Sequence, residues 1–152
     1  MPNLDDVVAL AAPESFLAMV STVRADATVQ STLVNAGVFA DPTDGADPAA
    51  QVVAFVSFPG AKLRNLRARP AVAVAFRSGW QWITVEGSAR IIGPDDPAPG
   101  IDAERLRLLL REVFIAAGGQ HEDWAEYDQV MLRDRRAAVL VAPTKIYSNP
   151  GR

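Results

Sequence analysis

The chain contains 152 residues, of which 49% are hydrophobic and 22% charged, a composition typical of one globular domain with a buried core. Cysteine is absent, which excludes disulfide bonds, thiol catalysis and cysteine-ligated metal. The formal net charge is -3, and the single histidine, His121, argues against a histidine-rich metal site or a Ser-His-Asp triad. We therefore expect residues 1–152 to form one domain that holds no metal.

The N-terminal residues lack the basic segment and the long apolar segment of a secretory signal. No apolar run approaches the roughly 18 residues that a membrane span requires. We expect a cytoplasmic protein that does not contact a membrane.

A short helix and a β-hairpin are the first elements that the sequence predicts. Asn3 is placed to cap a helix whose apolar stripe ends before Pro13. Residues 16–23 and 29–39 favour strands, joined by the short polar segment 24–28. The second strand is too polar for a dry core, so we expect a polar group to lie against it. Its polar residues are Gln30, Ser31, Thr32 and Asn35.

The stretch 51–76 predicts a strand, a tight turn, a basic helix and another strand, with the helix ended by Pro70. Residues 62–69 contain four basic residues and no acidic one, in a protein that is acidic overall. A helix N-terminus binds anions through its unpaired N–H groups, and Gly60 allows a ligand to approach the backbone. Lys62 and Asn65 are expected on one helix face. The stretch therefore predicts a local anion site.

Residues 80–92 predict a long strand, in which Gly87 indicates a bulge or a close backbone approach. A proline-rich loop follows, and Asp102 is placed to cap a helix that ends at Gly118 and Gly119. A second helix is expected to begin near His121, and residues 137–148 predict the last strand.

This order of elements predicts a mainly β fold with helices. It lacks the regular alternation of a doubly wound sheet. Neighbouring strands with short turns favour an antiparallel sheet, and six such strands most easily protect their edges by curling into a barrel.

Four groups of residues resemble the split-barrel family related to pyridoxamine 5′-phosphate oxidase, whose members use flavin or deazaflavin cofactors. The resemblance is nearest to the actinobacterial branch that uses the deazaflavin coenzyme F420, and it covers the chain from about residue 16 to residue 151. No single group is decisive, and their order and spacing carry the resemblance. The groups are residues 60–70; residues 79–82 with 85–87; residues 121–124 with Tyr127; and Arg135, Arg136, Ile146 and Tyr147.

The resemblance implies a six-stranded antiparallel split β-barrel that forms a homodimer, with the cofactor at the interface. Lys62 matches the family's phosphate-binding lysine, the polar second strand would lie along the ring system, and the strand from Trp80 would belong to the cofactor groove. The expected cofactor-binding residues are Gln30, Ser31, Thr32, Val34, Asn35, Ser57, Pro59, Gly60, Ala61, Lys62, Asn65, Trp80 and Gln81.

The resemblance further implies hydride transfer between F420 and a small organic substrate, whose identity the sequence does not reveal. We expect no catalytic side chain, because the cofactor carries the difficult chemistry.

One departure from the family pattern bears on the choice of cofactor. Flavin-using relatives often carry an arginine before the phosphate-binding lysine, and this chain has Ala61 there. The phosphate monoester of FMN carries nearly two charges and gains from paired cations, whereas the deazaflavin phosphodiester carries one. Ala61 therefore favours F420 over FMN, although backbone N–H groups could replace the missing side chain. Arg64 and Arg67 would remain available for the carboxylates of an oligoglutamate tail.

Other interpretations of these patterns remain open. The basic helix could be an exposed, solvated face, and the polar strand residues could meet water. Nucleic-acid binding is set aside because the protein is acidic overall. The alternatives in function are an FMN-dependent oxidase or reductase on the same fold and a non-catalytic protein that binds the cofactor or another planar ligand.

Overall fold

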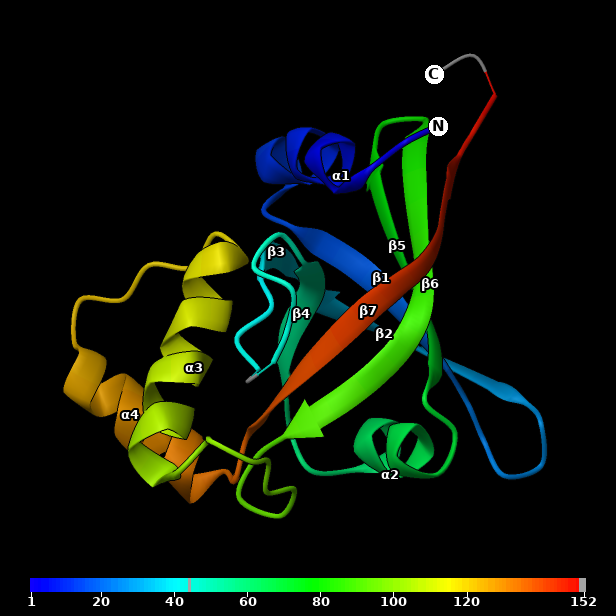
Figure 1. Cartoon of the computed structure of the whole chain (residues 1–152). Coiled ribbons are helices and arrows are strands. Elements are labelled where there is room, and N and C mark those ends of the chain that lie inside the picture. Colours follow the sequence, from blue (N-terminus) through cyan, green and yellow to red (C-terminus); the bar gives the residue numbers. More distant parts are fainter. Residues whose placement is uncertain (44, 151–152) are drawn as a thin grey trace.

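The computed structural model describes residues 1–43 and 45–150, which form one curled antiparallel sheet with helices packed around it (Figure 1). The strands run in the order β2-β1-β5-β6-β7-β4-β3. In chain order the elements are α1 (Leu4–Ala11), a 3₁₀ turn (Ala12–Glu14), β1 (Leu17–Val23), β2 (Val29–Asn35), β3 (Gly37–Ala40), β4 (Gln51–Ser57), α2 (Ala61–Ala68), β5 (Ala71–Ser78), β6 (Gln81–Ile92), α3 (Ala103–Ala116), α4 (Trp124–Arg133) and β7 (Ala137–Ser148).

The mainly β antiparallel architecture is confirmed, but the prediction of six strands is wrong. The expected strand 29–39 is divided at Ala36 into β2, which pairs with β1, and β3, which pairs with β4. These consecutive strands lie at opposite ends of the strand order, although one residue separates them. The sheet must therefore curl until its two edges approach each other.

The division of the strand places Ala36 in the core and Gly37 against a helix. Ala36 is fully buried, and its N–H donates to the carbonyl of Phe16 at 2.9 Å. A Cβ atom at Gly37 would lie 2.3 Å from the backbone carbonyl of Ala116. Only glycine therefore lets the C-terminal end of α3 approach β3 this closely.

The local signals for the helix ends are confirmed. Asn3 closes a capping box with Asp6, and Asp102 accepts a hydrogen bond from the N–H of Arg105 at 2.8 Å. Asp123 caps α4 in the same way, so this helix begins at Trp124, three residues after His121. The bulge expected at Gly87 is also present, as a register shift between β6 and β7.

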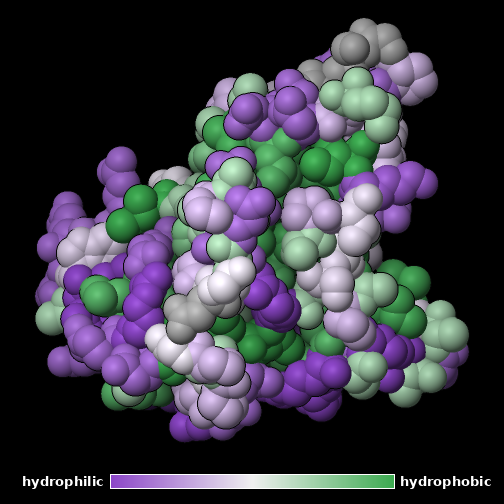
Figure 2. Space-filling view, in the orientation of Figure 1, coloured by the Kyte–Doolittle hydropathy of each residue, from purple (hydrophilic) through white to green (hydrophobic). Residues whose placement is uncertain are grey.

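Two hydrophobic clusters occupy the two faces of the curled sheet. The first fills the inside of the sheet and is closed by α1 at one end and α2 at the other (Figure 1). The second lies between β4, β7 and the paired helices α3 and α4. Hydrophilic side chains predominate on the side of the molecule formed by these two helices (Figure 2). Because β4 has a cluster on each face, residues 52–56 form an unbroken apolar run.

The outer face of β2, β1, β5 and β6 carries exposed apolar side chains. Strand pairing aligns Leu33, Met19, Ala75, Thr84 and Tyr147 in one row across five strands. Leu33 and Met19 are 60% and 42% exposed, so this face is apolar and uncovered in the single chain. A shallow groove of about 320 Å³ follows the row from Leu33 to Thr84.

None of the helices in the described ranges is both long enough and apolar enough to cross a membrane.

Candidate functional site

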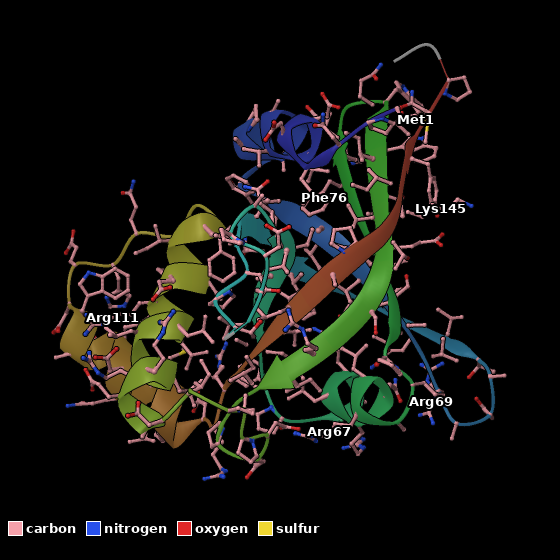
Figure 3. All side chains as sticks on the ribbon, in the orientation of Figure 1. Met1, Arg67, Arg69, Phe76, Arg111 and Lys145 are labelled. Carbon is pink, nitrogen blue, oxygen red and sulfur yellow. The ribbon has the colours of Figure 1, made fainter. Side chains whose placement is uncertain are left out.

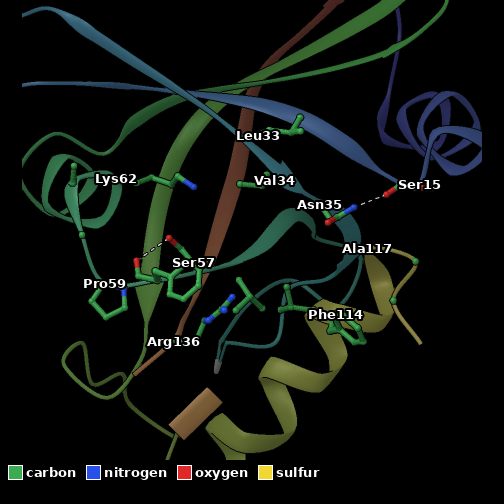
Figure 4. Close-up of a pocket in the computed structure, with 17 residues that line it drawn as sticks. Ser15, Leu33, Val34, Asn35, Ser57, Pro59, Lys62, Phe114, Ala117 and Arg136 are labelled. Atoms are coloured by element: carbon green, nitrogen blue, oxygen red, sulfur yellow. Dashed lines mark hydrogen bonds between the residues drawn. The ribbon is translucent and has the colours of Figure 1, made fainter. Parts of the chain in front are cut away.

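A cavity of about 540 Å³ opens where β2, the end of β4, the start of α2 and the end of α3 meet (Figure 4). The end of β4 and the start of α2 are consecutive in the chain, and the curl of the sheet brings β2 and the end of α3 to them. The cavity is lined by Ser15, Leu33, Val34, Asn35, Val56, Ser57, Phe58, Pro59, Gly60, Ala61, Lys62, Val113, Phe114, Ala117, Gly118, Gly119 and Arg136.

The N-terminal end of α2 forms the first polar wall of this cavity. Gly60 occupies the N-cap position, where no side chain caps the helix. The first backbone N–H groups of α2 are therefore left for another acceptor, at the positive end of the helix dipole. A Cβ atom at Gly60 would have no atom within 4 Å, so the space beside this backbone is open.

Lys62 extends from the first turn of α2 into the cavity (Figure 4). Its ammonium lies 5.5 Å from the centre of the buried Phe55 ring. Burial lowers the pKa of Lys62, because the charged form loses hydration there. None of the ion pairs among the described residues involves this lysine. Lys62 is thus a half-buried cation available to an anion.

Arg136 supplies a second cation to the cavity from the segment just before β7 (Figure 4). Its guanidinium carbon lies 3.4 Å from the centre of the Phe58 ring, which fixes the plane of the group. One nitrogen lies 3.6 Å from Asp134, and the buried Nε has no hydrogen-bond partner in the described structure. Arg136 is absent from the predicted site, although it belongs to one of the residue groups that carry the family resemblance.

The wall opposite α2 is apolar and comes from the end of α3. Phe114 and Ala117 line it, and the chain then turns at Gly118, where φ is +82°. Phe114 packs against Tyr127 with ring centres 5.0 Å apart. The Tyr127 hydroxyl donates to the carbonyl of Leu110 at 2.8 Å, and burial raises the pKa of Tyr127 to about 12. These contacts fix Phe114 as a rigid surface.

Strand β2 completes the cavity with Leu33, Val34 and Asn35. The Asn35 side-chain amide donates to the carbonyl of Ser15 at 2.8 Å (Figure 4), which orients its oxygen. Ser57, at the end of β4, donates to the carbonyl of Phe58 at 3.0 Å. Both side chains are therefore held in place at the wall.

The structure brings seven of the thirteen predicted site residues together in the cavity wall and places six outside it. The seven are Val34, Asn35, Ser57, Pro59, Gly60, Ala61 and Lys62. The residues outside the lining are Gln30, Ser31, Thr32, Asn65, Trp80 and Gln81.

Two of the polar residues outside the lining are bonded within the protein. Asn65 is buried, and its amide donates to Thr22 at 3.1 Å and to the Gln30 carbonyl oxygen at 3.3 Å. This network joins α2 to β1 and β2. The side chain of Asn65 therefore points towards these strands, whereas that of Lys62 points into the cavity. A contact inside the chain thus explains the polar character of Gln30, for which the sequence suggested an external polar group.

Ser31 and Thr32 lie on opposite faces of β2. Ser31 faces outward, and its hydroxyl lies 2.9 Å from that of Ser21. Thr32 faces inward, as Val34 does, and its buried hydroxyl has no hydrogen-bond partner among the described residues. Thr32 is the one polar residue of this strand whose hydroxyl is buried without a partner.

The two remaining predicted residues lie in and beside the turn between β5 and β6. Trp80 is 93% exposed, because the chain turns at Gly79 with φ of +59° and β6 begins only at Gln81. Trp82 packs edge-on against Tyr147, with ring centres 6.1 Å apart on the outer face of the sheet. The hydroxyl of Tyr147 donates to the Glu86 carboxylate at 2.5 Å, a partner that the sequence did not indicate.

Two of the four basic residues between positions 62 and 69 are bonded within the protein. Arg67 makes two hydrogen bonds to Asp96, at 2.6 and 2.7 Å, and Arg69 donates to the carbonyl of Val23 at 2.8 Å. Both arginines lie at the α2 end of the molecule (Figure 3). The expectation that Arg67 is available for an oligoglutamate tail is therefore wrong. Arg64 remains exposed on this helix.

In the described ranges, no three His, Cys, Asp or Glu side chains gather closely enough to hold a metal ion.

Three solved structures of similar fold bind or use different cofactors. An F420 reductase matches at 18% identity, with 97% of this chain and 98% of that chain covered and a TM-score of 0.61. A pyridoxamine 5′-phosphate oxidase-related, FMN-binding protein from Nostoc punctiforme matches at 11% identity, with 95% and 80% covered and a TM-score of 0.61. A heme-binding protein from Mycobacterium smegmatis matches at 13% identity, with 100% and 57% covered and a TM-score of 0.60.

No protein-family model matches the chain. At these identities the likeness to the three proteins shows a shared fold alone.

Proposed function

We infer that the protein is an F420-dependent oxidoreductase that transfers a hydride between the deazaflavin and a small organic substrate. One observation carries this proposal. A cavity between the strands and α3 places the half-buried Lys62, the uncapped end of α2 and Arg136 around one space, beside the apolar surface of Val34 and Phe114. A ligand with a phosphate and a planar ring fits this division of the wall into a cationic part and an apolar part.

The residues of the chain would bind and orient the cofactor. Lys62 and the first N–H groups of α2 would hold the phosphate, and Arg136 would reach it from the segment before β7. The rigid Phe114 and the β2 strand would exclude water from the ring and keep one of its faces towards the substrate. When bound, the deazaflavin supplies the two-electron hydride chemistry, so no catalytic side chain is assigned.

The residues present fit such a ligand. The cavity volume of about 540 Å³ lies within the range of small-molecule sites, and the buried Nε of Arg136, a residue of the lining, has no partner in the described chain. A phosphate oxygen of the cofactor would satisfy this N–H group, which otherwise costs free energy. Arg64 is exposed on α2 and could meet a negatively charged tail that extends out of the cavity.

FMN remains the second candidate, and Arg136 is the observation that favours it. The absence of an arginine before Lys62 argues against a doubly charged phosphate only where no other cation reaches the site. Arg136 lines the same cavity from the segment before β7, so two cations are present after all. Ala61 alone therefore discriminates less strongly between the two cofactors than the sequence suggests.

A homodimer would complete the site. The apolar row on the outer face of the sheet begins at Leu33, which also lines the cavity. A second copy of the chain packed on this face would cover the row and the mouth of the cavity together. The cofactor would then lie at the interface, as the family resemblance implies.

Turnover of the reduced deazaflavin tests the proposed activity. The purified protein is mixed with reduced F420 and, one at a time, with enones, quinones and tetrapyrroles, and oxidation of the cofactor is followed by its absorbance. We expect at least one acceptor to be reduced faster than in a protein-free control. Tight cofactor binding without turnover on any acceptor would overturn the enzymatic assignment and favour a cofactor-binding protein.

A further inference from the structure

A second cavity of about 540 Å³ lies between α3, α4 and the loop that follows β6. It is separate from the proposed cofactor site, and Arg136 is the one residue that lines both. Its walls are mostly apolar. The apolar residues of the lining include Ile92, Pro97, Ile101, Leu110, Met131 and Leu132.

The carboxylates that line this second cavity are already bonded within the protein. Asp128 accepts hydrogen bonds from Arg107 at 2.9 Å and from Arg111 at 2.5 and 2.9 Å. Arg107 also binds Glu104. Asp96 is paired with Arg67, and Asp102 accepts the N–H of Arg105 as the cap of α3. A cationic ligand would find these carboxylates already bonded and would lose its own hydration. The lining cation Arg107 is paired with Glu104 and Asp128, and the guanidinium of Arg136 lies over Phe58, which lines the first cavity.

The loop wall of the cavity is held in place by the chain. The loop closes on itself through two bridges, Gly93 with Asp96 and Ala98 with Ile101. Ion pairs from Asp95 to Arg135 and from Asp96 to Arg67 tie it to the start of β7 and to α2. Figure 1 shows this loop running from the tip of β6 to the start of α3. The space is therefore framed from three sides by anchored backbone.

Adaptable apolar side chains face the space. Met131 is buried at one wall, and its flexible thioether can adjust to ligands of different shape. Leu132 is 74% exposed and lies at the cavity lining, where a bound apolar molecule would cover it. Water in such an apolar space makes few hydrogen bonds, so an apolar ligand that displaces it gains free energy.

We propose that this second cavity binds a small, uncharged, largely apolar molecule, of the size of a two- or three-ring aromatic compound. The assignment follows from the volume of the cavity, from its apolar walls and from the hydrogen bonds that already engage the lining carboxylates. The proposal does not depend on the proposed function. Arg136 is the one residue that lines both cavities, and no other residue assigned to the cofactor lines the second.

The test uses phenylnaphthylamine, an uncharged dye that fluoresces in apolar surroundings. The full chain is titrated with the dye, and so are two variants that fill the cavity, Ala98→Trp and Ala103→Trp. The control is Leu108→Trp, which places the same side chain at an exposed position of α3 outside the lining. Circular dichroism establishes that each variant is folded, and either filled variant alone is sufficient for the comparison.

We expect saturable binding of one dye per chain, weakened at least tenfold by each filled variant and unchanged in the control. Absence of saturable binding would overturn the proposal, and so would equal binding by the filled variants, because the dye would then lie elsewhere. The sulfonated analogue of the dye should bind at least tenfold more weakly. Equal affinity for the sulfonated analogue would show that the site does not select uncharged ligands.

Discussion

Lys62 is the residue of the proposed site on which the assignment of a phosphate depends most. It is half-buried, lies at the uncapped end of α2 and takes part in no ion pair of the described chain. A partly buried charge without a partner destabilises the folded chain, and an anionic ligand would offset this cost. Arg136, the second cation of the cavity, is paired only weakly, with Asp134 at 3.6 Å.

Substitution of either cation should weaken cofactor binding. Lys62→Ala and Arg136→Ala each remove a charge-assisted contact to the phosphate, so each should cost about 1.5–3 kcal/mol, or roughly 10- to 150-fold in affinity. Fluorescence-quenching titration with F420 measures the change. The matched control is Arg24→Ala, which removes an exposed arginine outside both the cavity and the outer-face groove. Unchanged affinity in Lys62→Ala would remove this lysine from the phosphate site.

The lowered pKa of Lys62 predicts a pH dependence of both binding and stability. Desolvation lowers this pKa from its ordinary value of 10.5, so the protonated form is disfavoured by folding. The penalty is fully present below the folded pKa and disappears as the pH rises from that value to the ordinary pKa of 10.5. Lys62→Met should therefore stabilise the cofactor-free protein at neutral pH.

Affinity for the cofactor should change in the opposite sense, because the phosphate requires the charged lysine. Binding should weaken as the pH rises through the lowered pKa, at a lower pH than an ordinary lysine would give. Titrations between about pH 7 and pH 10.5 measure this, with thermal unfolding of Lys62→Met in parallel. A flat affinity profile, or a less stable Lys62→Met, would contradict the electrostatic account.

At the scale of elements, the close approach of β3 and α3 positions the apolar wall of the cavity. Gly37 allows this approach, because a Cβ atom there would lie 2.3 Å from the backbone of Ala116. The neighbouring Ala117 and the preceding Phe114 line the cavity. A displacement of the end of α3 would therefore widen the site.

Gly37→Ala should destabilise the fold by about 1–3 kcal/mol, since backbone must move to admit the methyl group. Cofactor affinity should fall as well, because the apolar wall moves with α3. The control is Gly60→Ala, whose added Cβ meets no atom within 4 Å and whose backbone is extended. Its stability should change by less than about 0.5 kcal/mol. Thermal unfolding distinguishes the two, and a wild-type stability of Gly37→Ala would contradict this account.

The elements that the sequence predicts well are those with local signals. Asn3 and Asp102 mark helix starts through bonds to residues three positions away, and the turn at Gly60 lies beside Lys62 in the chain. The break at Ala36 has no such local signal, since it arises when the two halves of a strand pair with different partners.

The same distinction holds for the site. Lys62 and Ser57 are neighbours in sequence and in space, whereas Arg136 and Phe114 join them only through the curl of the sheet. The pattern of residues 80–92 predicts a strand position for Trp80, but the turn at Gly79 leaves this residue in solvent. The sequence pattern therefore does not show that Trp82 packs against β7 while Trp80 is exposed.

At the scale of the whole molecule, the apolar outer face predicts a homodimer. Met19 lies in the middle of the row between Leu33 and Ala75, with 42% of its surface exposed. Met19→Asp would place a charge in the buried centre of an interface and should yield a monomer. Ile115→Asp, at an exposed position of α3, is the matched control. Light scattering after size-exclusion chromatography measures the mass, and a monomeric wild type would contradict the predicted dimer.

The central claim, that the cavity at α2 holds the phosphate and ring of F420, is tested most directly by parallel titration of the wild-type protein with F420 and with FMN. Both titrations are followed by fluorescence quenching under one set of conditions. The account predicts saturable binding of F420, at least about tenfold tighter than that of FMN, a difference of about 1.4 kcal/mol. Tighter binding of FMN would assign the site to the flavin, and failure to bind either cofactor would contradict the account.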